Sequence, residues 1–166
     1  QGVSSAASDV YKRQEPYDAS KHGSSVYFDG TDDYLTAADD ASLQPGSSDF
    51  TYEAWIYPTS APNTYNSIFT KRAGAPNYSG VQIAIKSSGV FSVLVSSGGS
   101  SWGIVDESSA SYKLNTWQHI AAVRSGNNFY FYVNGVQKIS TTISFSVYDM
   151  GSGQGIGCGA ANGAQP

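Results

Sequence analysis

The sequence predicts an all-β domain, built as a β-sandwich, a barrel or a jelly roll. Its 166 residues include 12 tyrosines and 18 glycines, whereas charged residues make up only 13%. This composition is typical of short strands joined by tight turns, and less so of long helices. Short apolar or alternating stretches recur along the chain, and turns rich in Gly, Ser or Asn separate them. The chain shows no heptad pattern, internal repeat or long amphipathic segment.

The first residues differ in character from the rest. The stretch SSAASDVYKRQ, residues 4–14, resembles the translation of a sequencing-library adaptor, so we expect the chain to derive from a metagenomic gene fragment. Its basic pair comes last and no apolar run follows it, which argues against a secretory signal. Residues 1–14 are therefore left out of the fold prediction, and residues 15–24 are interpreted as a linker. The domain is expected over residues 25–166.

The domain is expected to open with two short strands and then a long one. SVYFDG, Ser25–Gly30, is predicted to be a strand that stops at an Asp-Gly turn, and a second strand includes Tyr34 and Leu35. A loop over Ala41–Asp49 leads into the clearest strand, DFTYEAWIYP, Asp49–Pro58. Successive side chains of a strand alternate between its faces, and here both faces carry large side chains. We therefore expect this strand to be central and covered on both sides.

Further strands are expected at short intervals, each bounded by a turn. They fall within residues 67–71, 81–86, 90–96, 102–106, 116–124, 128–134 and 136–140. The Asn134-Gly135 pair joins the last two, and Asn-Gly between β-rich stretches is the strongest short-range signal for a hairpin. Many short strands with glycine-rich turns indicate a sandwich, barrel or jelly roll.

Charge and cysteine content exclude several classes of partner. The formal net charge is −4; without Asp9, Lys12 and Arg13, seven cations face twelve anions, and the net charge is −5. An acidic chain is not expected to bind nucleic acid or anionic membranes, because Lys and Arg dominate phosphate contacts. No apolar run reaches the roughly 18 residues of a membrane span, so no membrane insertion is expected. Cys158 is the single cysteine, which rules out a disulfide within the chain.

Four stretches of the sequence resemble one known family. SVYFDGTDDYL, DFTYEAWIYPT, SIFTKR and LNTWQHIAAVRSGNNFYFYVNGV are similar, in order and spacing, to laminin-G-like domains of the concanavalin A-like lectin/glucanase superfamily. The resemblance spans residues 25–163. It implies a jelly-roll sandwich of two antiparallel sheets that takes part in extracellular or virion-surface recognition, often of glycans. Members usually continue into one further strand, so the domain is expected to lack its last strand.

Catalysis is not expected from the acidic residues. Glycosidases of this superfamily carry paired carboxylates on one strand, and a retaining pair lies about 5–5.5 Å apart. Glu53 has no carboxylate two positions away, and Asp106 and Glu107 are adjacent, so they point to opposite faces. Glu53 is therefore interpreted as a structural strand residue. His22 lies in the linker, and the resemblance implies a structural position for His119.

Calcium is the one cofactor that the sequence suggests. Calcium takes six to eight oxygen ligands. Asp29, Asp32 and Asp33 surround the first turn, Asp39 and Asp40 open the next loop, and the resemblance implies further ligands near Asn77 and Asn162. Both of these are amides rather than carboxylates, which weakens the prediction. The alternative is that the aspartates bond their own backbone in the Asp-Gly turn.

Aromatic residues provide the candidate sugar-binding face. Sugar rings stack on aromatic faces while polar groups hold the hydroxyls. In NFYFYVN, Phe129, Phe131 and Val133 are predicted to point to the core. The residues expected on the binding face are Tyr130, Tyr132 and Asn134, with Trp55 and Tyr57 beside them and Trp102 at a rim. Trp117 is expected in the core. The alternative is that these aromatics only stabilise the sheet by cross-strand pairing.

The combined interpretation is a non-catalytic recognition module that binds a cell-surface glycan or another host-surface receptor. The approach KHGSSVYFDG resembles versions in phage structural proteins and bacterial surface proteins. It implies a longer parent protein with neighbouring domains, located outside the cell, on a cell surface or on a virion surface. One alternative is a purely structural decoration or spacer domain that makes protein–protein contacts. A second is a glycoside hydrolase.

Overall fold

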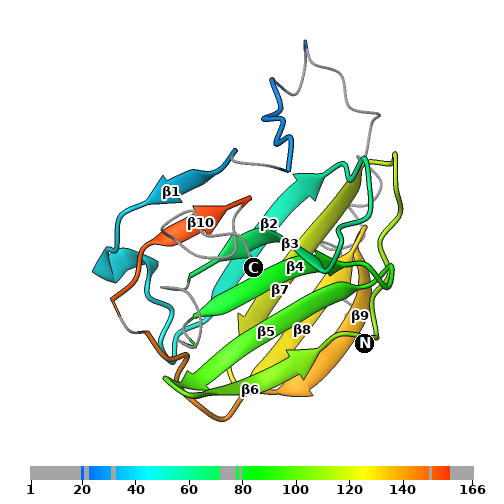
Figure 1. Cartoon of the computed structure of the whole chain (residues 1–166). Helices are drawn as coiled ribbons and strands as arrows, with labels where there is room; N and C mark the ends of the chain where they lie inside the picture. The colour runs from blue at the N-terminus through cyan, green and yellow to red at the C-terminus, as the bar shows by residue number, and fades with distance from the viewer. Residues whose placement is uncertain are drawn as a thin grey trace.

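Two antiparallel sheets, one behind the other, make up the fold (Figure 1). The computed structural model describes residues 20, 23–30, 33–71, 78, 80–149 and 151–157. The strands are β1 (Leu35–Ala37), β2 (Phe50–Ile56), β3 (Tyr65–Thr70), β4 (Val81–Lys86), β5 (Phe91–Gly98), β6 (Ser101–Asp106), β7 (Gln118–Ser125), β8 (Asn128–Val133), β9 (Val136–Thr142) and β10 (Gln154–Ile156). A short 3-10 helix, η1 (Ala41–Leu43), lies between β1 and β2.

The sheets have six and four strands. The first has the order β1-β10-β3-β4-β5-β6 and the second has the order β2-β7-β8-β9. Every neighbouring pair in both sheets runs antiparallel. The predicted jelly-roll sandwich of two antiparallel sheets is therefore confirmed.

The core fills the space between the two sheets. Val81, Ile83 and Ile85 of β4 lie in it, together with Phe129 and Phe131 of β8, and all five side chains are buried. Phe91 of β5 and Phe131 of β8 meet edge to face across the two sheets, with ring centroids 5.4 Å apart. Burial of one such side chain stabilises a fold by about 1.5–3 kcal/mol. The predicted inward face of residues 128–134 is confirmed.

The β8–β9 hairpin forms at the Asn-Gly pair, as predicted. Asn134 and Gly135 both adopt positive φ angles, 50° and 72°. This is the backbone of a primed hairpin turn, whose twist matches that of the flanking strands. The side-chain oxygen of Asn134 accepts a hydrogen bond from the backbone N–H of His119 at 2.8 Å. The turn is thereby fastened to the neighbouring strand β7.

Three predictions about the first strands and Trp117 are wrong. Ser25–Gly30 forms no strand, and Val26 and Tyr27 are exposed. Strand β2 lies at the edge of its sheet among the described residues, with one face exposed, so it is neither central nor covered on both sides. Trp117 is half-buried and lies outside the core cluster. Alternation shows which side chains share a face, but coverage of that face depends on distant segments.

Strands β1 and β10 also differ from expectation. The second predicted strand starts one residue late, at Leu35, and Tyr34 precedes it. Strand β10 pairs with β1 on one side and β3 on the other. Its sequence, Gln-Gly-Ile, has no alternation of its own, so only its position between two strands defines it. Among the described residues, no helix is long and apolar enough to cross a membrane.

Candidate functional site

The outer face of the four-stranded sheet carries a group of aromatic side chains, here called the aromatic platform. On β2, Thr51, Glu53 and Trp55 alternate with the residues that pack into the core. The register places His119 opposite Trp55, Ala121 opposite Glu53, and Tyr132 opposite Ala121. The platform therefore crosses three neighbouring strands. Its members are Glu53, Trp55, Tyr57, Trp117, His119, Tyr130 and Tyr132.

Trp55 is the most exposed aromatic of the platform. Its side chain is 52% exposed, and its ring packs at a tilt against the imidazole of His119, with centroids 5.3 Å apart. Nε2 of His119 lies 3.5 Å from Oε2 of Glu53. A large apolar ring, an imidazole and an exposed carboxylate thus lie next to one another.

Two further aromatic pairs flank this centre. Tyr57 is 43% exposed, and the centroid of its ring lies 5.4 Å from that of the Trp117 ring. Tyr130 and Tyr132 follow one another on the outer face of β8, with ring centroids 6.1 Å apart. Ala121 on β7 separates Glu53 from Tyr132 in the register. Because its side chain is only a methyl group, the outer surface of the sheet is recessed at this position on β7, between β2 and β8.

The platform has the chemistry of a sugar-binding surface. Exposed aromatic faces cover the apolar side of a pyranose ring, and nearby polar groups hold its hydroxyls. Glu53 offers acceptors, and His119 offers a ring nitrogen beside them. Glu53 is the only carboxylate in strands β2, β7, β8 and β9, all of whose residues are described. Glycoside hydrolysis normally needs two carboxylates flanking one bond, so the platform fits binding better than hydrolysis.

The structure separates two of the predicted binding residues from this group. Trp102 lies on β6 of the other sheet, half-buried against Tyr78 with centroids 5.1 Å apart. Asn134 lies at the end of β8, where its side-chain oxygen is bonded to the backbone of His119. The other four predicted residues, Trp55, Tyr57, Tyr130 and Tyr132, share one face. Trp117 and His119 join them, although the sequence was interpreted as placing Trp117 in the core.

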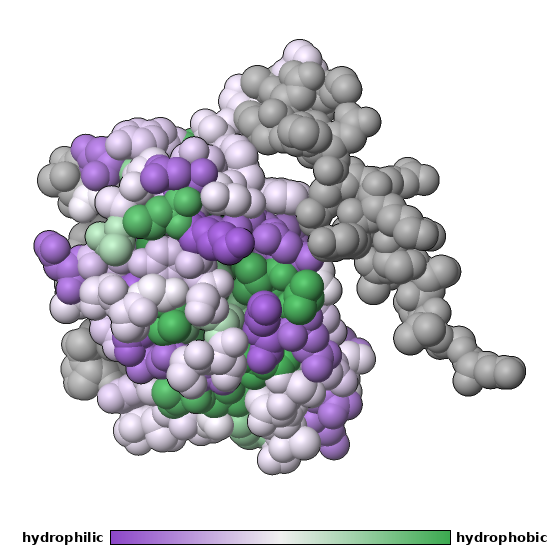
Figure 2. Space-filling model, turned by 90° about the vertical axis from the view of Figure 1, so that its right-hand side faces the viewer, coloured by the Kyte–Doolittle hydropathy of each residue, from purple (hydrophilic) through white to green (hydrophobic). Residues whose placement is uncertain are grey.

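A groove of about 440 Å³ opens between the edge strands β6 and β9. Residues 103–106, 109 and 138–141 line it, and no aromatic ring is among them. Figure 2 shows the side of the molecule on which β9 lies in Figure 1, and hydrophobic residues reach the surface there in several separate patches. Scattered apolar residues are normal on soluble proteins. The groove therefore has less sugar-binding chemistry than the platform.

The predicted calcium residues are only partly described. Asp29 and Asp33 are exposed, and the backbone N–H of Asp29 donates to the carboxylate of Asp33 at 3.1 Å. The carboxylate of Asp33 thus bonds the backbone four residues before it, which differs from a bond of Asp29 to its own turn. Asp32, Asn77 and Asn162 lie outside the described residues. Within the part of the chain that the structure describes, no three His, Cys, Asp or Glu side chains form a group able to hold a metal.

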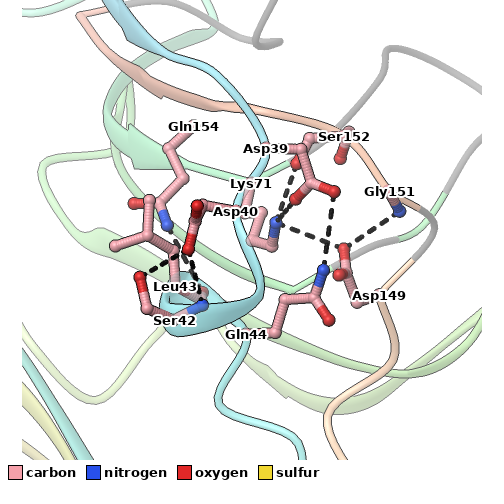
Figure 3. A network of polar contacts seen from close by, with 10 residues as sticks. All are labelled: Asp39, Asp40, Ser42, Leu43, Gln44, Lys71, Asp149, Gly151, Ser152 and Gln154. Atoms are coloured by element: carbon pink, nitrogen blue, oxygen red, sulfur yellow. Dashed lines mark hydrogen bonds and ion pairs between the residues drawn. The ribbon is translucent and has the colours of Figure 1, made fainter.

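A polar network that the sequence analysis missed lies around Lys71 (Figure 3). The side chain of Lys71 is fully buried, and its Nζ donates to Asp39 Oδ1 at 2.7 Å and to the carbonyl of Ser152 at 2.8 Å. Asp149 Oδ1 lies 3.3 Å from the same nitrogen. The hydrogen bond from Lys71 holds the pKa of Asp39 below its usual value. These partners lie 32 to 81 residues apart in sequence from Lys71, so no local pattern announces them.

A second ion pair, partly exposed at both partners, joins Lys86 to Glu107. Lys86 Nζ lies 2.8 Å from Glu107 Oε2, and the hydroxyls of Ser92 and Tyr65 donate to Glu107 Oε1. Lys86 also lies over the ring of Tyr65, 5.1 Å from its centroid. The hydrogen bond to Glu107 raises the pKa of Lys86. The cluster satisfies the carboxylate internally, so it is a structural pair and a weaker candidate for ligand binding.

Comparison with known proteins agrees with the fold. The family model of the concanavalin A-like lectin/glucanases superfamily matches residues 29–166. A search of curated proteins finds no match. One similar solved structure is a protein of Bacteroides ovatus proposed to bind carbohydrate, at 21% identity and a TM-score of 0.58, covering 80% of this chain and 37% of that one.

Two further structures share the same architecture. One is domain 4 of AbnA, an extracellular arabinanase of Geobacillus stearothermophilus, in complex with arabinotriose, at 19% identity and a TM-score of 0.52, covering 75% of this chain and 57% of that one. The other is the binding domain of botulinum neurotoxin serotype G, at 17% identity and a TM-score of 0.51, covering 77% and 34%. The chain thus spans less than two thirds of the length of each of these three proteins. At these identities the similarity shows the fold.

Proposed function

The chain belongs to the concanavalin A-like lectin/glucanases superfamily, and from this premise we propose that it is a non-catalytic module that binds carbohydrate through the aromatic platform. The observation that carries the proposal is the exposed Trp55 ring, packed on His119 beside the carboxylate of Glu53. A residue that served only the core would not expose 52% of a tryptophan side chain.

Similar structures support the proposal indirectly. The Bacteroides ovatus protein is proposed to bind carbohydrate, and domain 4 of AbnA was solved with arabinotriose. The fold hosts many functions, so the argument for this chain has to come from its own site. That site supplies flat aromatic area and a few polar groups, which is the usual composition of a sugar-binding surface.

The wider setting is also part of the proposal. The ligand is a glycan on a cell surface or another host-surface receptor, and the chain is a part of a longer phage structural or bacterial surface protein with neighbouring domains. That protein acts outside the cell or on a virion surface. Calcium at the first turn, through Asp29, Asp32 and Asp33 with Asn77 and Asn162, remains a prediction that a calcium titration would test.

Binding to a glycan array tests the proposal. The wild-type chain is expected to bind one class of glycan in EDTA as well as in calcium, and Trp55→Ala is expected to lose at least about tenfold in affinity, or about 1.4 kcal/mol. The unfolding temperature of the variant should stay close to that of the wild type, because the ring is half exposed.

Tyr27→Ala provides the matched control. Tyr27 is 71% exposed and lies in the segment before β1, outside the platform. The Tyr27→Ala variant loses an exposed aromatic ring that lies outside the platform, so its affinity for the glycan should equal that of the wild type. A folded wild-type chain that binds no glycan, or that loses equal affinity in both variants, would overturn the proposal. A folded chain without any glycan ligand would favour the decoration or spacer interpretation instead.

A further inference from the structure

The Lys71 ammonium lies in a cage of oxygen atoms. Lysine has three N–H donors, and three acceptors surround Nζ at 2.7, 2.8 and 3.3 Å: Asp39 Oδ1, the Ser152 carbonyl and Asp149 Oδ1. Figure 3 shows the carboxylates and the carbonyl converging on the nitrogen. The side chain of Lys71 is 0% exposed and that of Asp149 only 14%. The buried ammonium therefore donates two hydrogen bonds and forms an ion pair with a second carboxylate.

The cage joins three segments at one end of the six-stranded sheet. Asp39 follows β1, Lys71 follows β3, and Asp149 and Ser152 precede β10. Those three strands are neighbours in the order β1-β10-β3. The ammonium thus connects two loops to the end of the strand that carries it. A bound metal ion holds loops together in the same way in many proteins.

The charges of the cage do not cancel. Two carboxylates face one ammonium, so the three side chains carry a net charge of −1. A divalent cation between the same carboxylates would bring the sum to zero. The ligand types also fit a hard cation, because carboxylate and carbonyl oxygens are what calcium and magnesium bind. The charge and the ligands therefore favour a divalent ion wherever the ammonium is absent.

Two hydrogen bonds orient the carboxylates of the cage, and the segment that supplies the carbonyl also carries a buried hydroxyl. The hydroxyl of Ser152 is buried and has no hydrogen-bond partner among the described residues. The amide of Gln44 donates to the other oxygen of Asp39 at 3.5 Å, and the N–H of Gly151 donates to Asp149 at 3.2 Å. These contacts orient both carboxylates, as outer-shell groups do in metal sites. The unused hydroxyl is a further oxygen within a segment that already supplies a ligand.

We propose that the ammonium of Lys71 occupies an oxygen-lined cation site. In the natural chain this ammonium holds the junction together without a metal ion. When the ammonium is removed, the same oxygen atoms bind a divalent cation. Calcium–oxygen distances of 2.3–2.6 Å are shorter than those around Nζ, so the loop carboxylates must move inward by a few tenths of an ångström. Asp39 is 30% exposed on a loop and has the freedom to do so. Water fills the space of the missing side chain.

Calcium titration of Lys71→Ala tests the proposal. By calorimetry the variant is expected to bind one calcium ion more per chain than the wild type. Its unfolding temperature in EDTA should lie below that of the wild type and should rise by several degrees in millimolar calcium, because a ligand that binds only the folded state stabilises it. Lys71→Ala/Asp39→Asn should lose the additional calcium ion.

Lys86→Ala is the matched control. It removes an ammonium from a cluster with a single carboxylate, Glu107, and should gain no calcium binding. A folded Lys71→Ala variant with no more calcium bound than the wild type would overturn the proposal. If this variant is unfolded in EDTA, recovery of its fold in calcium supports the proposal. If it stays unfolded in both, calcium does not take the place of the ammonium, and this result contradicts the proposal.

Discussion

The rings of Trp55 and His119 pack against each other across strands β2 and β7, with centroids 5.3 Å apart. Their exposure differs: Trp55 is 52% exposed, whereas the side chain of His119 is only 17% exposed. The histidine is therefore the more buried cross-strand neighbour of the tryptophan, and about half of the tryptophan remains exposed to solvent. This division makes the effects of substitutions at the two positions distinguishable.

Replacing His119 separates ring support from polar contact. His119→Phe keeps a flat ring beside Trp55 and should keep glycan affinity within about threefold of the wild type. His119→Ala leaves Trp55 without its neighbour and should lower affinity at least about tenfold. Both affinities are measured by calorimetry on the glycan that the array identifies. Equal losses in the two variants would show that the imidazole nitrogen, and not the packing, matters for binding.

Glu53 tests whether the polar edge of the platform contacts the ligand. Its side chain is 64% exposed and pairs only loosely with His119, at 3.5 Å. Glu53→Ala should therefore change the free energy of unfolding by no more than about 0.5 kcal/mol. Affinity for the glycan should fall at least about fivefold, since hydroxyl groups lose an acceptor. An unchanged affinity of Glu53→Ala would show that Glu53 does not contact the ligand and that the aromatic rings provide the binding.

Sequence patterns predict local features of this fold well. Strand β4 has the bounds that its alternation predicts, Val81–Lys86, and the hairpin forms at Asn134-Gly135. In both cases the determining information lies within a few neighbouring residues. Alternation also assigned the inward face of β8 correctly, with Phe129 and Phe131 fully buried. Four of the predicted binding residues share a face because the register of β2, β7 and β8 aligns them.

Features that depend on distant segments could not be predicted. Large side chains on both faces of β2 suggested a covered strand, yet Trp55 is exposed because no described segment lies over it. Ser25–Gly30 has the composition of a strand but lacks a partner strand among the described residues. Lys71 is the last residue of a predicted strand, and nothing in the neighbouring sequence indicates that it is buried. Only the fold brings Asp39 and Asp149 to it. Pattern identifies faces and turns, whereas contacts across the chain decide burial.

Arg124 is predicted to be one of the most sensitive positions for stability. It is 4% exposed, and its guanidinium donates to the carbonyls of Gly46, Phe145 and Gly126 at 3.0–3.1 Å. Arg124→Met would remove this donor from all three carbonyls; Gly46 keeps the N–H of Val147 as a partner and Gly126 is exposed, so the main cost is the half-buried carbonyl of Phe145, and an interior carbonyl left unpaired costs about 1–3 kcal/mol. The unfolding temperature should fall by at least about 5 °C. A smaller drop would show that water replaces the guanidinium at these carbonyls.

Gly80 is predicted to tolerate no side chain. Its φ angle is +61°, and a Cβ at this position would lie 2.7 Å from the Cβ of Lys71. Its N–H also donates to the carbonyl of Tyr148 at 2.7 Å, which fixes the backbone in place. Gly80→Ala should destabilise the fold by about 1–3 kcal/mol, through backbone strain and displacement of Lys71. Gly89→Ala is the control, because Gly89 has a similar φ of +83° with nothing within 4 Å of its Cβ.

Stability should fall in acid partly because of Glu107. Burial acts to raise the pKa of Glu107, but the hydrogen bonds from Lys86 and Ser92, together with the charge of Lys86, outweigh it and lower the pKa below its ordinary value of 4.5. A carboxyl whose pKa is lower in the folded state stabilises the fold above its unfolded pKa. That contribution is lost as the pH falls through the folded pKa. The acid-sensitive window therefore begins near pH 4.5 and extends below it.

Replacement of Glu107 by glutamine should remove this part of the acid response. At neutral pH, Glu107→Gln should lower the stability by about 1 kcal/mol or less, since the pair is partly exposed and solvent screens it. Between pH 7 and about pH 3 the variant should then lose less stability than the wild type, because the amide has no proton to gain. Circular dichroism melts at the two pH values measure the difference. An acid response of Glu107→Gln equal to that of the wild type would mean that the Lys86–Glu107 pair contributes nothing to it, and that the aspartates with a lowered pKa, Asp39, Asp40 and Asp106, account for the loss.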